Sequence, residues 1–285
     1  MIFIVIKSLG LLVKGLLIIL GGLAVHAYAA ERTRPVFAII DFFPFGYLSS
    51  EQNAEGMAFD IEKVLEKYSG IDIDGRLMST PRALRSASVG QTDLLFSYKD
   101  DDMVPNVTWL GNVGCLVPLV VPRKGSGITS LADLNKRKRI GFVGLGYFDI
   151  NRRHQWDLEP VVLNNNFLMV NMLSRGRVDA IIVNDAVLNA FTTRTDLIEN
   201  VPEDWISNVA EPIHLASFET HISISNDSPF ISLVPTLKKA IKKARKAGEF
   251  IKVFKKYGSP MGGYCYNSQE LIEKQWLNLP MSNRD

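Results

Sequence analysis

Three aromatic side chains in one loop suggest that this chain binds a small molecule. Phe42, Phe45 and Tyr47 fall within six residues after Asp41, in a stretch that Pro and Gly interrupt. Aromatic rings bury a large apolar area and can stack on a ligand, although they can also simply pack against the protein. We take Asp41 and the three rings as candidate ligand contacts.

Arg82 is the candidate anchor for a negatively charged ligand. Thr80 can cap a helix, and Pro81 suits its first position. A cation at a helix N-terminus opposes the helix dipole, so Arg82 calls for a compensating negative group. An anionic ligand would supply one, and an ordinary surface ion pair is the alternative.

A second candidate anion site consists of backbone groups. Gly144, Gly146 and Tyr147 follow an apolar run at 139–143, and their N–H groups could bind an anion or a carbonyl. A plain turn is the alternative interpretation.

No residue pattern indicates catalysis. His154, His214 and His221 lack metal-ligand spacing with Cys or carboxylates, and the chain has no Gly-x-Ser-x-Gly or phosphate-binding loop. We therefore expect no enzymatic activity, no metal and no cofactor.

A short sequence motif, Gly-x-x-Asp, occurs twice, and its context predicts the helices and strands that must position these residues. Gly90-Gln91-Thr92-Asp93 and Gly176-Arg177-Val178-Asp179 each follow a helical pattern and precede a short, β-rich apolar run. Such a Gly can close a helix, and an unalternating apolar strand is covered on both faces. Coincidence is the alternative for so short a motif. The matched context predicts two similar α/β lobes, whose strand ends face a common cleft.

The N-terminus resembles a secretory signal peptide. Lys7 and Lys14 precede an apolar stretch, and Ala27-Tyr28-Ala29 forms a small-x-small cleavage site. We expect cleavage after Ala29 rather than a retained anchor. Removing the two lysines leaves 30 basic residues of the original 32 against 30 acidic ones, and nothing in this balance suggests a nucleic-acid partner.

Cys115 and Cys265 are the only cysteines in the 285 residues. Export permits a disulfide, and a lone pair has one possible connectivity. Two buried free thiols are the alternative. A lysine-rich stripe over 238–246 is most simply a solvated helix face, with a membrane or acidic-partner patch as the alternative.

Several blocks in a fixed order carry a resemblance to a known family. They are Phe42-Phe43-Pro44-Phe45, Gly56-Met57-Ala58-Phe59-Asp60, Ser130-Leu131-Ala132-Asp133-Leu134, Arg139-Ile140-Gly141, Gly176-Arg177-Val178-Asp179-Ala180 and the stretch 247–258. Over residues 35–258 the chain resembles the type II periplasmic solute-binding proteins, particularly those of polar amino-acid ABC transporters.

This resemblance implies an α/β fold of two periplasmic-binding-protein-like type II lobes joined by two crossing hinge strands. Residues 30–117 plus 222–285 would form lobe 1 with a C-terminal tail, and residues 118–221 would form lobe 2. Both cysteines then belong to lobe 1, so we expect them to be joined. The resemblance further implies a small-molecule ligand, a membrane permease as partner, and a periplasmic protein that we expect to be monomeric.

The resemblance also bears on the ligand. Amino-acid-binding members hold the carboxylate with an Arg in lobe one and the ammonium with an Asp after the second Gly-x-x-Asp strand. Here Ser97-Tyr98-Lys99 offers no Arg, and Asn184 stands at the Asp position unless the register shifts by one to Asp185. Because unpaired buried charges are costly, we expect a small polar or anionic metabolite rather than a zwitterion. We expect Arg82 to anchor it, Asn184 to serve as a neutral hydrogen-bond partner, and Ser97, Tyr98 and Lys99 to be further ligand contacts.

Two alternatives to transport stay open. One is an exported enzyme resembling cyclohexadienyl dehydratase, with Glu51, Glu55 or Asp41 as a general acid. The other is a ligand-sensing module.

Overall fold

The computed structural model describes residues 32–135, 137–143, 156–193, 202, 204–259 and 265. Val36–Asp285 form one compact unit, separate from Met1–Pro35. The expected signal peptide, the predicted contacts Gly144, Gly146 and Tyr147, and most of the expected C-terminal tail lie outside the described residues. No helix in the described part of the chain is long and apolar enough to span a membrane.

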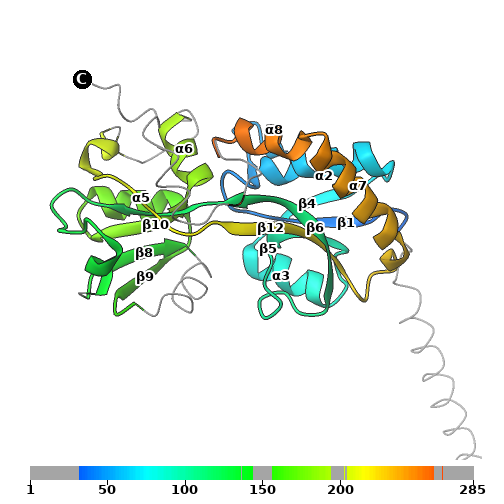
Figure 1. Ribbon diagram of the computed structural model, residues 1–285, viewed down its shortest axis with the longest axis horizontal. Coiled ribbons are helices and arrows are strands. Elements are labelled where there is room, and N and C mark those ends of the chain that lie inside the picture. The colour runs from blue at the N-terminus through cyan, green and yellow to red at the C-terminus, as the bar shows by residue number, and fades with distance from the viewer. Residues whose placement is uncertain are drawn as a thin grey trace, which may run out of the picture. The chain divides into compact units, whose positions relative to one another are not determined.

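The first lobe is built on a mixed sheet with the strand order β4-β1-β5-β12-β6 (Figure 1). Its strands are β1 (Val36–Ile40), β4 (Asp74–Met78), β5 (Leu94–Tyr98), β6 (Val107–Leu116) and β12 (Phe218–Ser225). Its helices are α2 (Met57–Ser69), α3 (Thr80–Ser88), α7 (Val234–Lys246) and α8 (Glu249–Lys256). Helices α2, α7 and α8 cover one face of the sheet and α3 covers the other, so the central strands are buried on both faces.

The second lobe is built on a sheet with the order β11-β7-β10-β8-β9. Its strands are β7 (Pro118–Pro122), β8 (Arg139–Val143), β9 (Glu159–Leu163), β10 (Ala180–Asn184) and β11 (Ile213–His214). The helices α5 (Asn166–Ser174) and α6 (Asp185–Thr193) pack against it. Short elements complete the described fold: the hairpin β2 (Tyr47–Leu48) and β3 (Ala54–Glu55), and the 3₁₀ turns Leu131–Asn135, Trp205–Asn208 and Ile231–Leu233.

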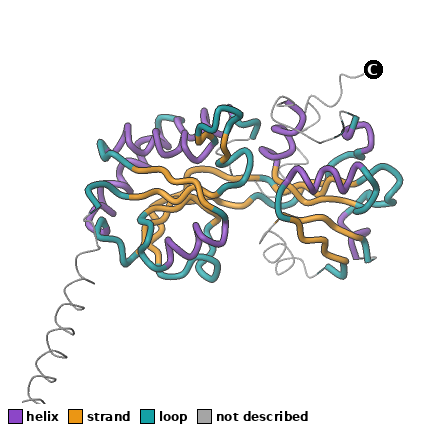
Figure 2. Tube along the Cα trace, turned by 180° about the vertical axis from the view of Figure 1, so that it is seen from behind, coloured by secondary structure: helices purple, strands orange, loops and turns teal. Residues whose placement is uncertain are grey.

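The sheets of the two lobes share one arrangement of strands, as the repeated Gly-x-x-Asp motif predicts. In each, a central strand (β1 or β8) lies between two parallel neighbours, and an antiparallel strand (β12 or β7) follows on one side. Viewed from behind, strands and helices are layered in both lobes (Figure 2). The predicted two-lobed α/β fold is therefore confirmed.

The repeated Gly closes the helix before it in both lobes. Gly90 and Gly176 have φ values of 70° and 66°, in the left-handed region that favours glycine. Their N–H groups bond to the carbonyls of Ala87 and Leu173, and the N–H of the next residue in each copy bonds to the carbonyl one residue earlier, that of Ser86 or Met172. This is the Schellman arrangement, which satisfies the last carbonyls of the helix and turns the chain towards the following strand.

The repeated Asp fixes the central strand of each lobe. Asp93 donates its N–H to the Val36 carbonyl at 2.9 Å and accepts the Val36 N–H on Oδ2 at 2.7 Å. Asp179 makes the same two contacts with Arg139, at 2.7 and 2.9 Å. Val36 and Arg139 are the first residues of β1 and β8. Each Asp therefore sets where a central strand starts, and so where it ends at the cleft.

Within the described residues, the chain crosses between the two sheets at two places. Val117 separates β6 of the first sheet from β7 of the second, and residues 215–217 separate β11 from β12. β6 and β12 pair antiparallel along their lengths and lead side by side towards the second lobe. The expected lobe boundary at 221 lies inside β12, whose first residue, Phe218, already pairs with Leu116 of β6.

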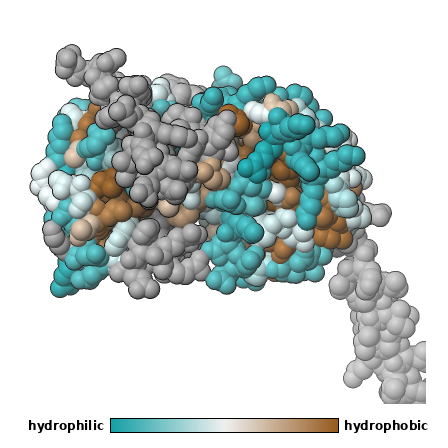
Figure 3. Space-filling view, in the orientation of Figure 1, coloured by the Kyte–Doolittle hydropathy of each residue, from teal (hydrophilic) through white to brown (hydrophobic). Residues whose placement is uncertain are grey.

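The structure corrects the predicted N-cap of α3 and confirms the predicted exposure of the lysine stripe. The helix expected at Thr80 does begin there, but Ser79 rather than Thr80 occupies the N-cap position, because the first turn already includes Thr80. The lysine-rich stripe is confirmed as an exposed face of α7. Figure 3 shows hydrophilic residues over this side of the first lobe.

Replacing Asp93 by Ala should destabilise the fold by roughly 2–4 kcal/mol, because it leaves the Val36 N–H and the Ser228 hydroxyl, which lies 2.6 Å from Oδ1, without their buried acceptor. Asp179→Ala should cost less, since its side chain is 17% exposed and water can reach its partners. Chemical denaturation of both variants measures the difference. Equal losses, or a loss under about 1 kcal/mol for Asp93→Ala, would contradict the assigned role.

Candidate ligand-binding cleft

A cavity of about 210 Å³ lies where the strands of both lobes end. The first lobe lines it with the loop after β1 and with the end of β5, and the second lobe lines it with the ends of β8 and β10. In open α/β sheets, ligands bind at the carboxyl ends of strands. A molecule in this cavity would therefore contact both lobes.

Aromatic rings form much of the wall on the side of the first lobe. The rings of Phe42 and Phe45 stack at 5.9 Å, and Phe45 lies 6.4 Å from Phe96. Tyr98 meets Phe218 edge-on at 5.5 Å. Rings that pack against one another lose little freedom when a ligand arrives, so this wall is preorganised.

The polar groups of the wall are held by the backbone. Ser97 Oγ donates to the Tyr98 carbonyl at 3.0 Å, and Thr220 Oγ1 donates to the Gly114 carbonyl at 3.0 Å. Asn184 Oδ1 accepts the Val187 N–H at 2.9 Å and so caps the start of α6. Asn166 Nδ2 donates to the Phe43 carbonyl at 2.9 Å.

The cavity brings together five of the residues predicted from the sequence. Phe42, Phe45, Ser97, Tyr98 and Asn184 all line it. Asp185, the alternative match for Asn184, is not among the lining residues, so the geometry favours Asn184 as the cleft residue.

Arg82 and Lys99 lie exposed and are not among the described lining residues. Thr80 and Leu84 of α3 do line the cavity. Because residues four apart share a helix face, Arg82, midway between them, faces away from the cavity. Its expected contact with a ligand stays a prediction that this lining does not support.

Asp41 and Tyr47 line a second cavity of about 730 Å³, together with Asn164, Asn165 and Asn171 of the second lobe. Phe42 and Asn166 belong to the walls of both cavities. The larger cavity thus adjoins the smaller one and is richer in polar side chains. Glu51 and Glu55, the other candidate general acids, line neither cavity.

Phe43 joins the two lobes, a role that its sequence position did not reveal. Its ring lies 5.7 Å from Phe167 of α5 and 6.1 Å from Phe191 of α6, and its carbonyl accepts the hydrogen bond from Asn166. The same aromatic loop therefore contributes Phe42 and Phe45 to the cavity and Phe43 to the contact between lobes.

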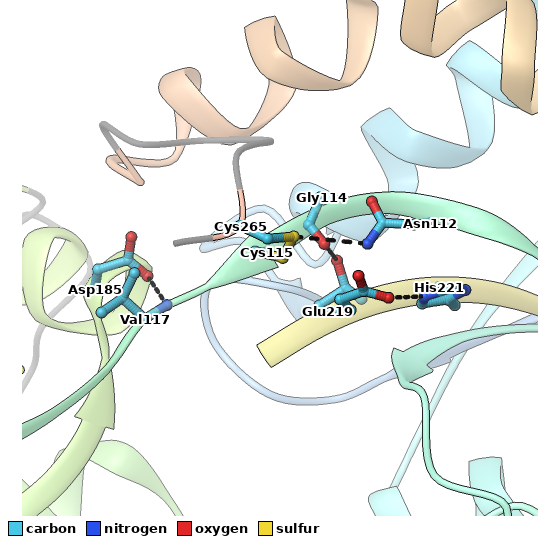
Figure 4. The surroundings of a disulfide bond; sticks show 9 residues. Asn112, Gly114, Cys115, Val117, Asp185, Glu219, His221 and Cys265 are labelled. Atoms are coloured by element: carbon cyan, nitrogen blue, oxygen red, sulfur yellow. Dashed lines mark hydrogen bonds and ion pairs between the residues drawn. A yellow bond between two sulfur atoms is a disulfide. The ribbon is translucent and has the colours of Figure 1, made fainter. Parts of the chain in front are cut away.

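A buried carboxylate holds one of the two crossings. Asp185 Oδ1 accepts the Val117 N–H at 3.2 Å, and its own N–H donates to the Val117 carbonyl at 2.9 Å. Its Oδ2 accepts the Ser259 hydroxyl at 2.6 Å. Figure 4 shows Asp185 beside Val117, where β6 leaves the first sheet. Burial raises the pKa of Asp185 to about 6, because desolvation outweighs these hydrogen bonds.

The predicted disulfide is present beside this crossing. Cys115 and Cys265 are bonded, with their Cα atoms 5.3 Å apart (Figure 4). Cys115 lies two residues before Val117, and Asn112 Nδ2 donates to Cys265 Sγ at 3.8 Å. The bond therefore ties residue 265 to the strand that leads into the crossing.

Asp185 should make stability depend on pH. Well below pH 4 its carboxyl is protonated in both the folded and unfolded states, and well above its folded pKa of about 6 it is ionised in both. Since the folded state binds the proton more tightly, the free energy of unfolding should fall by roughly 1–3 kcal/mol between pH 4 and 7.

In Asp185→Asn this contribution should vanish, and the variant should be the more stable protein at pH 7. Asn can still accept from Val117 and donate to the Ser259 oxygen. Glu62, whose pKa burial raises to about 7, contributes equally to both proteins. Urea denaturation from pH 4 to 7 measures the two profiles. Parallel profiles for wild type and variant would show that Asp185 does not carry the effect.

No family model matches the chain. A curated relative, a probable histidine-binding protein of Neisseria gonorrhoeae, is 24% identical over 229 residues, which cover 78% of this chain and 82% of the relative.

Solved structures share the fold. The substrate-binding protein of an amino-acid ABC transporter superposes with a TM-score of 0.60 at 20% identity, over 79% of this chain and 99% of that one. A substrate-binding protein of an ABC uptake transporter from Streptococcus pneumoniae, with bound histidine, gives 0.64 at 15% identity, over 81% and 94%. The chain therefore has the two-lobed type II fold of the periplasmic solute-binding proteins, as the resemblance in its sequence implies.

Proposed function

We propose that this protein is an exported solute-binding protein that captures a small molecule between its lobes and delivers it to a membrane permease. One observation carries the proposal: strand ends of the first lobe and of the second lobe line the same cavity of about 210 Å³. A ligand that contacts both lobes favours the closed arrangement over any open one, because only the closed arrangement offers all its contacts.

The proposal extends to export and to the partner. The fold occurs in substrate-binding proteins of ABC transporters, and the curated relative is named for binding rather than for catalysis. Cleavage after Ala29, a periplasmic location, a monomeric state and a permease partner belong to the proposal as expectations from the sequence.

Binding without turnover is the proposed mode of action. The fold is also shared by an ancestral amino-acid-binding protein described as a precursor of cyclohexadienyl dehydratase, with a TM-score of 0.61. Of the candidate general acids, however, Asp41 lines only the larger cavity and Glu51 and Glu55 line neither. Within its described lining, the smaller cavity thus lacks the three acids on which the enzymatic alternative depends.

The expected ligand was a small polar or anionic metabolite. The cavity volume supports a small ligand. The anionic part of that expectation rests on Arg82, and the described lining gives it no support.

Gently purified protein should carry a bound small molecule, and native mass spectrometry should show it as added mass. The released compound, at a hundred times its Kd, should stabilise the protein by about 2.7 kcal/mol. Phe42→Ala should weaken binding by about tenfold, since it removes half of the stacked pair.

Val162→Ala is the matched control, because Val162 is 53% exposed on β9 and lines neither cavity. Its affinity should stay at the wild-type value. If no added mass appears, and no small-molecule extract of the source cells raises the melting temperature, the proposed function is wrong.

A further inference from the structure

We infer that Gly258 and Ser259, which follow α8, form a latch that holds the second lobe against the first and thereby sets how tightly the cleft binds its solute. We call these two residues the latch. They line neither of the two cavities, so they would act on affinity without touching the solute. This inference rests on the proposed function and adds positioning residues to it.

The first lobe fixes the position of the latch. The Ser259 N–H donates to the carbonyl of Phe254, a buried core residue of α8, at 3.0 Å. The Tyr257 hydroxyl, one residue before the latch, donates to the carboxylate of Asp60 on α2 at 3.0 Å. The latch therefore belongs to the rigid body of the first lobe.

The latch contacts one face of α6 in the second lobe. The Ser259 hydroxyl donates to Asp185 Oδ2 at 2.6 Å, and Asn189 lies one helical turn further on the same face. Figure 1 shows the end of α8 next to α6. Gly258 has a φ of 76°, and a methyl group at this position would overlap the side chain of Asn189, whose Cβ would lie 2.7 Å away. Both the backbone angle and the close approach require glycine.

Helix α6 connects the latch to the cleft. Asn184, the residue before α6, lines the smaller cavity and accepts the Val187 N–H at 2.9 Å. Phe191, near the other end of α6, lies 6.1 Å from Phe43 of the first lobe. The first lobe thus holds α6 both at Phe43 and at the latch. Any contact that favours the solute-binding arrangement of the lobes raises the affinity for the solute.

Gly258→Ala tests the latch, and Gly248→Ala is its matched control. Gly248 has a φ of 72°, but within the described residues a methyl group there would meet no atom within 4 Å apart from its chain neighbours. Spin labels on unnatural amino acids at the exposed Val162 of β9 and Lys239 of α7 report the distance between the lobes. In solute-free protein, Gly258→Ala should shift or broaden the distance distribution, whereas Gly248→Ala should keep that of the wild type.

Affinity is measured with the compound that native mass spectrometry identifies in the wild-type protein. Gly258→Ala should weaken its binding by about tenfold. Asn189→Gly removes the side chain that the new methyl group would overlap. In the Asn189→Gly background, Gly258→Ala should therefore weaken binding by less than about twofold, a rescue that a general loss of stability would not produce.

Ser259→Ala tests the latch independently, also if Gly258→Ala does not fold. Its matched control is Ser228→Ala, because Ser228 likewise donates to a buried carboxylate at 2.6 Å, that of Asp93 within the first lobe. Both variants should lower the free energy of unfolding. Only Ser259→Ala should change the distance distribution and weaken binding, by about fivefold.

Distance distributions that neither Gly258→Ala nor Ser259→Ala alters would overturn the inference. So would controls that alter distance or affinity as much as the latch variants, or the absence of rescue by Asn189→Gly. The distance measurement needs no solute, so it tests the latch even where native mass spectrometry finds no bound compound. Failure of the latch and failure of the proposed function are therefore distinguishable.

Discussion

The backbone of Val117 is the point on which the arrangement of the two lobes depends. Both its N–H and its carbonyl are bonded to Asp185 at the start of α6, while Val117 itself lies between a strand of the first sheet and a strand of the second. Asp185 also accepts from Ser259, which follows α8 of the first lobe. One buried carboxylate thus links the crossing strand, the second lobe and the end of the first lobe.

Burying the ionised Asp185 carboxylate in this link reduces the stability of the fold, because desolvation favours the neutral carboxyl. The disulfide two residues away restrains the same strand by a covalent route. The lobe closure that we propose would require the backbone to bend at Val117 and at residues 215–217, where the chain passes from one sheet to the other. Hinges of this kind are a few residues at the ends of elements, which take up the change in backbone angles while the sheets stay rigid.

The same pair of hydrogen bonds from an Asp holds the central strand of the sheet in each lobe. Asp93 and Asp179 each fix the first residue of a central strand, and the strands then end at the cleft with Phe42 and Tyr98 on one side and Asn184 on the other. Phe43 adds a further contact between the lobes, to Phe167 and Asn166 of α5. The cleft is consequently bordered by parts of the fold whose positions are set by backbone hydrogen bonds.

Much of this frame could be predicted from the sequence, because it depends on local signals. A Gly after a helical pattern and an Asp before an apolar run specify helix, turn and strand without knowledge of the rest of the chain. The aromatic loop could be placed at the cleft because it follows a strand, whereas Asn184, the last residue of β10, was indicated by the family resemblance.

Side-chain direction and long-range partners could not be predicted in this way. The charge of Arg82 at a helix start predicts a contact with a ligand, but which face of α3 meets the cleft depends on how the helix packs on the sheet. Phe43 and Asp185 gain their roles only from residues more than a hundred and about seventy positions away, respectively.

The central claim is that a small solute closes two rigid lobes about the crossing strands. Small-angle X-ray scattering of the protein with and without the solute found by native mass spectrometry tests it most directly. The radius of gyration should fall when solute is added to solute-free protein, and the scattering of the bound form should match the described lobes in contact through Phe43 and Asn166. Identical scattering curves with the solute bound at saturation would contradict the claim.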